Sequence, residues 1–295
     1  MLRLNDHLQI LNLSDNVILK TGTVEIAKSL QLNNSLQKIN LSGNNIGTEG
    51  VIEIATMLKS NNSLKSLGLR NNLIDSLGII KIAESLESNN HLQELDLAHN
   101  MIGNGAILIA KSLQSNSLLR ILNLCNNDIN KIESIQIAKM LLSNNSLLEL
   151  DLSYNTICTE GAIEIAKSLQ SNNSLLKLYL SSNNIGSEGA IEIAKMLTIN
   201  NSLCKLYLSY NPVGANGVAE IIKSLELNNS LQVLELVCSK TNINEIIALV
   251  DILEHNYCIT KINLGTKVQK LDEITSRNQK IYNESRFTKM KVARN

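Results

Sequence analysis

The chain has 295 residues and a formal net charge of zero, so its overall charge does not point to nucleic acid or to a membrane surface as a partner. Hydrophobic residues make up 44% of the chain, yet aromatic residues make up only 2%, with one Phe and no Trp. The core must therefore be built from aliphatic side chains. No stretch of 18 apolar residues occurs, so we expect no membrane-spanning helix.

The cysteines and histidines point to neither a disulfide framework nor a metal site. Five cysteines lie far apart without a C-x-x-C pair, which is typical of reduced thiols inside a cell. The four histidines lack metal-ligand spacing with one another or with cysteine. Residues 1–10 also lack the apolar segment of a secretory signal. We therefore expect a cytoplasmic protein that holds no metal and no other cofactor.

A repeat organises the chain. The frame L-x-x-[LI]-x-L-x-x-N recurs every 28 residues, with one interval of 27. Its ten copies begin at Leu8, Leu36, Leu64, Leu92, Leu119, Leu147, Leu175, Leu203, Leu231 and Ile259, and the first eight have the final Asn. The shorter interval is a loop deletion at 103–105. Ten copies in register indicate one structural unit used repeatedly.

Each repeat changes its hydrophobic period partway through. In residues 35–45, Ile39 and Leu41 alternate with polar neighbours, which predicts a strand. In residues 47–58, Val51, Ile54 and Leu58 share one helical face. Parallel strands lie about 4.8 Å apart, whereas helices need about 8–10 Å. Stacked repeats therefore curve into an arc, with the strands inside and the helices outside.

The pattern resembles the ribonuclease-inhibitor-like subclass of leucine-rich repeats. The resemblance covers residues 8 to about 267 and is clearest in NNIGTEGVIEIATML (44–58) and NNIGSEGAIEIAKML (183–197). It implies an α/β solenoid shaped as a horseshoe, with a parallel sheet on the concave face and helices on the convex face. It also implies that the concave face binds other proteins.

Some repeats depart from the pattern at the turn before the helix. Repeat two has glycine at positions 47 and 50, whereas repeat five has Asn130 and Glu133. Leu19 and Cys158 replace the first glycine in repeats one and six. These turns are expected to be altered loops.

The ends of the stack need caps. Residues 1–267 hold the ten predicted repeats, and 268–295 are expected to form a capping helix and a basic tail. Leu271, Ile274 and Ile281 predict an apolar stripe on that helix. Residues 1–7 are too few for a separate cap, so we expect the first repeat to close its own end.

An asparagine at the ninth frame position recurs, and no surface role requires an amide in every copy. We expect each to turn inward and bond backbone groups that the strands leave without partners. These residues are Asn16, Asn44, Asn72, Asn100, Asn127, Asn155, Asn183 and Asn211.

Frame positions three, five, seven and eight project from the inner wall and carry the predicted binding surface. Four of the six tyrosines fall at these positions in three consecutive repeats, namely Tyr154, Tyr179, Tyr207 and Tyr210. Since the core uses almost no aromatic residue, and tyrosine is enriched at binding hot spots, we interpret them as a partner site. The alternative is that tyrosine merely suits a β surface. The predicted charged residues around them are Lys177, Lys205, Glu149, Asp151, Glu94 and Asp96.

The leading interpretation is a non-catalytic scaffold, a monomer that binds a protein and not a nucleic acid. A regulator of a small GTPase is the alternative, because the Ran GTPase-activating proteins resemble this chain in repeat class. Only Arg70 and Arg120 within the repeats could supply the arginine that such activity often needs. His99 and Cys125 lie on adjacent predicted strands, but such a pair is more often coincidence than a nucleophile.

The near-identical repeats, rich in Asn, Ile, Lys and Ser, also resemble the repeat proteins of intracellular bacteria. That resemblance implies an effector that acts in the cytosol of a host cell. A protist protein fits the same composition.

Overall fold

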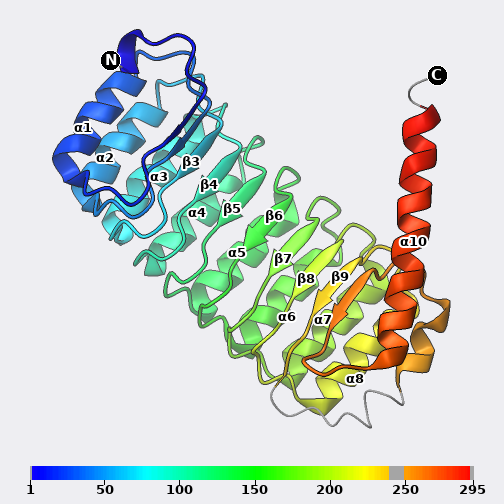
Figure 1. The fold of residues 1–295 in the computed structure, drawn as a ribbon. Helices are drawn as coiled ribbons and strands as arrows, with labels where there is room; N and C mark the ends of the chain where they lie inside the picture. The colour runs from blue at the N-terminus through cyan, green and yellow to red at the C-terminus, as the bar shows by residue number, and fades with distance from the viewer. Residues whose placement is uncertain (1, 239–248, 293–295) are drawn as a thin grey trace. The chain divides into compact units, whose positions relative to one another are not determined.

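The computed structural model describes residues 2–238 and 249–292, and Figure 1 shows its fold. The chain forms two compact units, Met1–Ile157 and Cys158–Asn295. The repeat pattern continues through this boundary and gives no sign of it.

The first unit contains six parallel strands that pair in sequence order. Its strands are β1 (Ile10–Asn12), β2 (Lys38–Asn40), β3 (Ser66–Gly68), β4 (Glu94–Asp96), β5 (Ile121–Asn123) and β6 (Glu149–Asp151). Its helices are η1 (Leu2–Leu4), α1 (Leu19–Leu30), α2 (Gly47–Leu58), α3 (Ser76–Ser88), η2 (Gly103–Gly105), α4 (Ala106–Leu113) and α5 (Lys131–Ser143).

The second unit repeats the arrangement with four strands in sequence order. Its strands are β7 (Lys177–Tyr179), β8 (Lys205–Tyr207), β9 (Val233–Glu235) and β10 (Lys261–Asn263). Its described helices are α6 (Cys158–Leu169), α7 (Ser187–Ile199), α8 (Gly214–Ser224), η3 (Asp251–His255) and α10 (Gln269–Val292).

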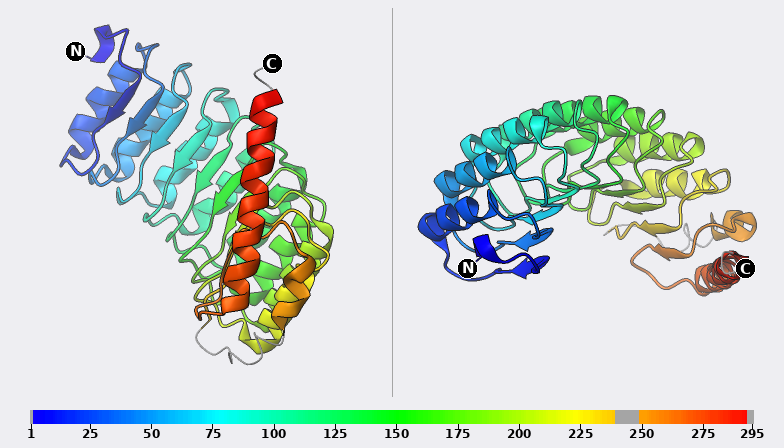
Figure 2. Two further views of the ribbon diagram at one scale, coloured as in Figure 1. Left: turned by 45° about the vertical axis from the view of Figure 1, so that its right-hand side comes forward. Right: turned by 90° about the horizontal axis from the view of Figure 1, so that it is seen from above.

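Within each unit the helices form one layer and the strands form another (Figure 2). We call the side of each sheet that points away from its helices the open face. The predicted α/β solenoid of alternating parallel strands and helices is confirmed.

The hydrophobic frame forms the core, as the sequence predicts. In the second repeat, Leu36, Ile39 and Leu41 are at most 2% exposed. Val51 and Ile54 of α2 pack from the other layer and are fully buried. Each such side chain stabilises the fold by about 1.5–3 kcal/mol.

The two irregular turns have local physical causes. Repeat four is one residue shorter than the others, and in it the chain enters α4 through the 3₁₀ turn η2. A 3₁₀ turn needs fewer residues than an α turn. Where repeat five lacks glycine, Asn130 and Glu133 form a reciprocal capping box at the start of α5. The backbone N–H of Asn130 donates to Glu133 Oε2 (3.0 Å), and that of Ile132 donates to Asn130 Oδ1 (2.7 Å).

The ninth-position asparagines bond backbone groups, as predicted. Asn72 is fully buried and joins two repeats. Its Oδ1 accepts the N–H of Asn44 (2.9 Å), and its Nδ2 donates to the carbonyl oxygen of Leu41 (2.9 Å). Asn16 differs because no repeat precedes it. It is exposed, and its Nδ2 donates to the carbonyl oxygens of Leu13 and Ser14.

A second asparagine ladder, which the repeat frame alone does not reveal, runs along the C-terminal ends of the helices. Asn61 Nδ2 donates to the carbonyl oxygens of Leu30 (2.7 Å) and Asn33 (3.2 Å), one repeat earlier. Its Oδ1 accepts the N–H of Leu64 (2.8 Å). The same interval places members at Asn33, Asn61, Asn89, Asn116, Asn144, Asn172, Asn200, Asn228 and Asn256.

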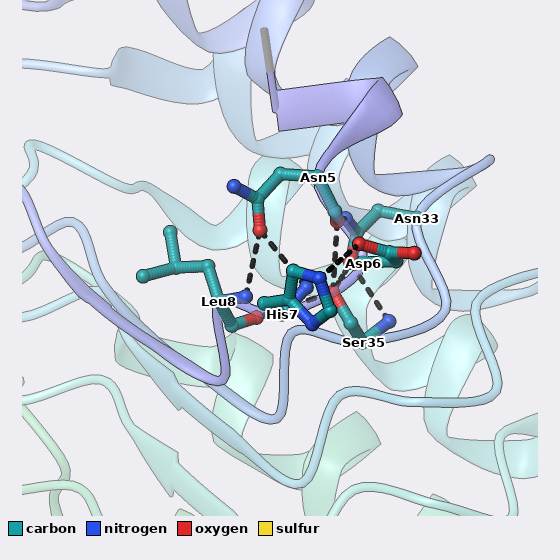
Figure 3. Close-up of polar contacts among 6 residues, drawn as sticks. All are labelled: Asn5, Asp6, His7, Leu8, Asn33 and Ser35. Carbon is teal, nitrogen blue, oxygen red and sulfur yellow. Dashed lines mark hydrogen bonds and ion pairs between the residues drawn. The ribbon is translucent and has the colours of Figure 1, made fainter.

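The N-terminal residues continue this second ladder (Figure 3). Asn5 lies 28 residues before Asn33 and imitates it, since its Oδ1 accepts the N–H of Leu8 (2.7 Å). Asn33 Nδ2 donates to the carbonyl oxygens of Leu2 (2.9 Å) and Asn5 (2.8 Å), and Ser35 Oγ donates to that of Asn5 (2.9 Å). The expectation that the first repeat closes its own end is therefore wrong, because residues 2–8 supply the acceptors that a preceding repeat supplies elsewhere.

At the other end, α10 covers the last strand. Leu271 and Ile274 are buried at 5% exposure, as predicted. Ile281 is 42% exposed, so the apolar stripe ends at Ile274. The next buried residue of the helix is the polar Asn278, which is 0% exposed. Arg277 adds bonds to the carbonyl oxygens of Glu254 and Asn256, both at 2.8 Å.

Candidate functional site

Each strand places its first and third residues on the open face. In β7, the middle residue Leu178 is 1% exposed, whereas Lys177 and Tyr179 are half-buried. The other strands alternate in the same way, because successive side chains of a strand point to opposite faces. On the first unit this places Glu94, Asp96, Glu149 and Asp151 on the open face, and on the second unit Lys177, Tyr179, Lys205, Tyr207 and Glu235.

Tyr179 and Tyr207 form a stacked pair on the second unit. They are partners in the register of β7 and β8, as the repeat frame predicts. Their ring centroids lie 4.3 Å apart, and the ring planes differ by 8°. Both residues are half-buried, so the rings pack on each other while part of their surface stays accessible. Aromatic contacts of this kind contribute about 0.5–1.5 kcal/mol beyond burial.

The other two predicted site tyrosines, Tyr154 and Tyr210, occupy the eighth frame position, where the backbone has a left-handed conformation. Tyr154 has φ of 56° and is 57% exposed, and Tyr210 has φ of 61° and is 69% exposed. At the same frame position, repeats two, three and five have Gly43, Asn71 and Asn126, which are better suited to that conformation. A bulky residue in the left-handed conformation lowers the free energy of unfolding by about 1–2 kcal/mol. Tyr154 belongs to the first unit, whereas Tyr179, Tyr207 and Tyr210 belong to the second.

Lysines surround the stacked pair. Lys177 and Lys205 are register partners, as are Tyr207 and Glu235. Glu235 is held by Lys261 Nζ (2.5 Å) and Asn263 Nδ2 (2.7 Å), and its hydrogen bond raises the pKa of Lys261. The described strand residues of this open face therefore carry three lysines against one glutamate.

The first unit has a different open face, which is hollowed and acidic. A groove of about 510 Å³ runs over its strands, with Ser66 and Gly68 of β3 among its lining residues. Glu94, Asp96, Glu149 and Asp151 of the predicted site also line the groove. Sequence reasoning found these carboxylates but missed Ser66, Gly68 and Lys261, although the same frame positions locate all three.

Burial shifts the pKa of two titratable groups of the first unit, Cys125 and His99. Burial, with the Asp151 carboxylate nearby, raises the pKa of the Cys125 thiol to about 11. Burial and the Arg70 guanidinium lower the pKa of His99. Its Nδ1 lies 3.0 Å from Asn126 Nδ2. The His99–Cys125 pair therefore lacks the low-pKa thiol that a cysteine nucleophile needs.

Among residues 2–238 and 249–292, no three His, Cys, Asp or Glu side chains gather in a way that suits a metal ion. In the same part of the chain, no helix combines the length and the apolar character needed to cross a bilayer.

Comparison with known proteins agrees with the architecture. A family model described as "Leucine Rich repeat" matches residues 4–27, 32–55, 88–108, 143–166 and 171–194. The matched segments of this chain are leucine-rich repeats. No curated protein matches the chain.

One similar solved structure is a leucine-rich repeat-containing protein, LegL7 from Legionella pneumophila. It is 24% identical, the match covers 91% of each chain, and the TM-score is 0.57. Leiomodin-1 actin-binding site 2 (19% identity, 55% of this chain and 97% of that chain) and the tropomodulin C-terminal domain of Caenorhabditis elegans (14%, 53% and 98%) both have TM-scores of 0.47. The likeness to LegL7 concerns the fold. The chain resembles bacterial repeat proteins in that respect.

Proposed function

We propose that the protein is a non-catalytic scaffold that binds a protein partner on the open faces of its repeats. The observation that carries the proposal is the Tyr179–Tyr207 stack, with ring centroids 4.3 Å apart on an exposed sheet face. The stack offers a rigid aromatic surface at low entropy cost, and the half-buried Lys177 and Lys205 beside it supply a charged border.

The strained tyrosines support the same interpretation. A chain selected for stability alone has no reason to place a tyrosine at φ of 61° with 69% of its surface exposed, as at Tyr210. Contact with a partner would compensate for that cost. For the first unit, we propose a binding surface of its own on the open face, formed by Tyr154, Glu149, Asp151, Glu94 and Asp96.

We further propose that the protein acts as a monomer in a cytosol, without cofactor or nucleic acid. Its likeness to LegL7, a leucine-rich repeat-containing protein of Legionella pneumophila, supports a bacterial effector that works in a host cell. Five cysteines without a disulfide among them suit that reducing environment.

The GTPase-regulator alternative has less support. Arg120, one of its two arginines in the repeats, donates through Nη1 to the carbonyl oxygen of Ser146 (2.9 Å) and so is held by its own fold. The hydrolysis of GTP by a panel of small GTPases with added protein tests this alternative. Acceleration of any of them would favour the regulator over the scaffold.

The scaffold proposal is tested with the Y179A/Y207A variant in quantitative pull-downs. The Tyr282→Ala variant is the control, because Tyr282 is 41% exposed on α10 and lies away from the sheet. For each captured protein we expect the double variant to lose about 2 kcal/mol of affinity, roughly thirtyfold, with an unchanged circular dichroism spectrum. If wild type and double variant capture every protein equally, the tyrosines do not bind a partner.

A further inference from the structure

Strand β8 of the second unit carries two hydrogen-bond donors that have no acceptor within the described part of the chain. The Lys205 ammonium forms no hydrogen bond and no ion pair there, and the Tyr207 hydroxyl forms no hydrogen bond. Both residues are half-buried on the open face. Because alternate residues of a strand share a face, their Cα atoms lie about 7 Å apart on it. Both donors are therefore available to a group from outside.

The neighbouring strands do not supply a carboxylate to Lys205. Its register partners are Lys177 on β7 and Val233 on β9. Glu235 is the one carboxylate among the described strand residues of this open face, and its Oε1 lies 2.5 Å from Lys261 Nζ on β10. Glu235 is therefore directed toward β10, and the charge of Lys205 has no counter-ion on the strands beside it.

The tyrosine stack fixes the position of the second donor. Tyr207 packs on Tyr179 with ring centroids 4.3 Å apart and ring planes that differ by 8°, so a turn of its ring out of the stack would lose this contact. The hydroxyl is thus held in place before a ligand binds, and little conformational entropy is lost on binding. The Lys205 side chain is flexible and adjusts to a ligand that the hydroxyl already holds.

We propose that this face binds an extended acidic segment of the partner protein, in which two carboxylates accept hydrogen bonds from the Lys205 ammonium and the Tyr207 hydroxyl. The inference rests on the proposed scaffold function and adds the chemistry of the partner. Charge complementarity carries it, because the open face has three lysines against one glutamate, and that glutamate is held by Lys261. The spacing of about 7 Å matches acidic residues two apart in an extended segment, Glu-x-Glu.

The expected spacing makes a sharp probe. We would measure fluorescence anisotropy of the full chain with three labelled 12-residue peptides. The first carries four glutamates as two Glu-x-Glu pairs among serines and alanines. The second has the same composition with a glutamate at every third position, so that neighbouring carboxylates point to opposite faces of an extended peptide. The third has lysine in place of glutamate. We expect the first to bind at least fivefold more tightly than the second, and the third not to bind.

The decisive variants are K205Q, which removes the charge, and Y207F, which removes the hydroxyl and keeps the ring. The matched control for the charge is K195Q, because Lys195 lies on α7 and pairs with Glu192 (2.9 Å). We expect K205Q to weaken binding of the first peptide at least tenfold, Y207F at least threefold and K195Q less than twofold. Equal losses in K205Q and K195Q, full affinity in Y207F, or no binding by the wild-type chain would overturn the proposal.

A single-stranded nucleic acid is the other ligand that lysines beside aromatic rings bind. In the stack, Tyr179 and Tyr207 each cover one face of the other ring, which leaves less ring surface for a base. We therefore expect a labelled 12-nucleotide oligothymidylate to bind more weakly than the first peptide. Tighter binding of the oligonucleotide, lost in K205Q, would identify a nucleic acid as the ligand and rule out the acidic segment.

Pull-downs with K205Q separate this inference from the scaffold proposal. If the acidic segment is correct, K205Q loses the same captured proteins as Y179A/Y207A, and K195Q retains them. If the double variant loses them and K205Q retains them, the scaffold proposal stands and the acidic partner is ruled out. If neither variant loses any, both proposals fail.

Discussion

Asn278 Nδ2 donates to the carbonyl oxygen of Asn256 (2.9 Å) and to that of Ile259 (2.9 Å). In the repeats, the carbonyl oxygen that corresponds to that of Asn256 accepts from the asparagine of the next repeat, as Asn200 accepts from Asn228 Nδ2 (3.1 Å). The one that corresponds to that of Ile259 accepts from a serine, as Leu203 accepts from Ser230 Oγ (3.1 Å). A residue of the capping helix α10 therefore takes the part of a repeat residue, although it lies 22 residues after Asn256 instead of 28. The cap therefore ends the second asparagine ladder with a bond that the repeats also use, from an asparagine Nδ2 to the carbonyl oxygen of the preceding ladder asparagine.

The first prediction concerns this cap. Asn278→Ala should destabilise the second unit by about 1–3 kcal/mol, because the carbonyl oxygen of Ile259 loses this donor and that of Asn256 keeps only Arg277 Nη2. Urea unfolding followed by circular dichroism measures the loss. Hydrogen exchange should quicken first in β10, which is the strand under the cap.

Asn283→Ala is the matched control on the same helix, since Asn283 is exposed and accepts from Gln279 Nε2 (3.1 Å). We expect its unfolding midpoint to stay within experimental error of wild type. Equal destabilisation by the two variants would mean that α10 depends on helix propensity and not on the Asn278 bonds.

Much of the fold can be predicted from the sequence, because the leucine frame of one strand–helix unit occurs ten times. The leucine frame and the ninth-position asparagines each recur at a fixed interval, so one repeat such as 35–62 predicts the strand, the helix and the inward amide of the others. The second ladder was present in the same interval. The sequence alone does not distinguish this role of Asn61 from that of an ordinary residue at a helix end, because Asn is common there for reasons of turn geometry.

The candidate site was predictable in part. The frame places Tyr179 beside Tyr207, and the register agrees. The left-handed φ of Tyr154 and Tyr210 depends on how the loop after each strand turns, and a residue pattern does not report a dihedral angle. Likewise the close approach of Asn40 Oδ1 to Gly68, 2.6 Å from where a Cβ would lie, depends on the packing of neighbouring strands and not on one residue pattern.

The ninth-position ladder gives a second prediction. Asn72→Ala removes a fully buried amide that bonds Asn44 and Leu41, so it should cost about 1–3 kcal/mol of stability in the first unit. Thermal unfolding of Asn72→Ala is compared with that of Asn62→Ala, which alters an exposed asparagine at the end of the preceding repeat. A stability of Asn72→Ala close to that of Asn62→Ala would contradict the role of the ladder.

The third prediction concerns the Cys125 thiol, whose pKa is raised to about 11 from an ordinary value of 9.0. Because the native state favours the protonated thiol, Cys125 contributes stability below pH 9 that is lost as the pH rises toward 11. At pH 8 its alkylation by iodoacetamide, followed by mass spectrometry, should be many times slower in the native chain than in urea. Equally fast alkylation in both states would show a reactive thiol and revive the nucleophile interpretation.

The last prediction separates stability from binding at Tyr210. Replacing it with asparagine, the residue of repeats three and five at this frame position, relieves a left-handed tyrosine and should stabilise the second unit by about 1 kcal/mol. The same change removes an exposed aromatic ring from the open face, so affinity for a captured partner should fall by at least fivefold. Urea unfolding and a binding titration are carried out on the same preparation. A variant with higher stability and unchanged affinity would show that Tyr210 has no part in the binding surface. A contact between Tyr210 and the partner predicts that affinity falls while stability rises.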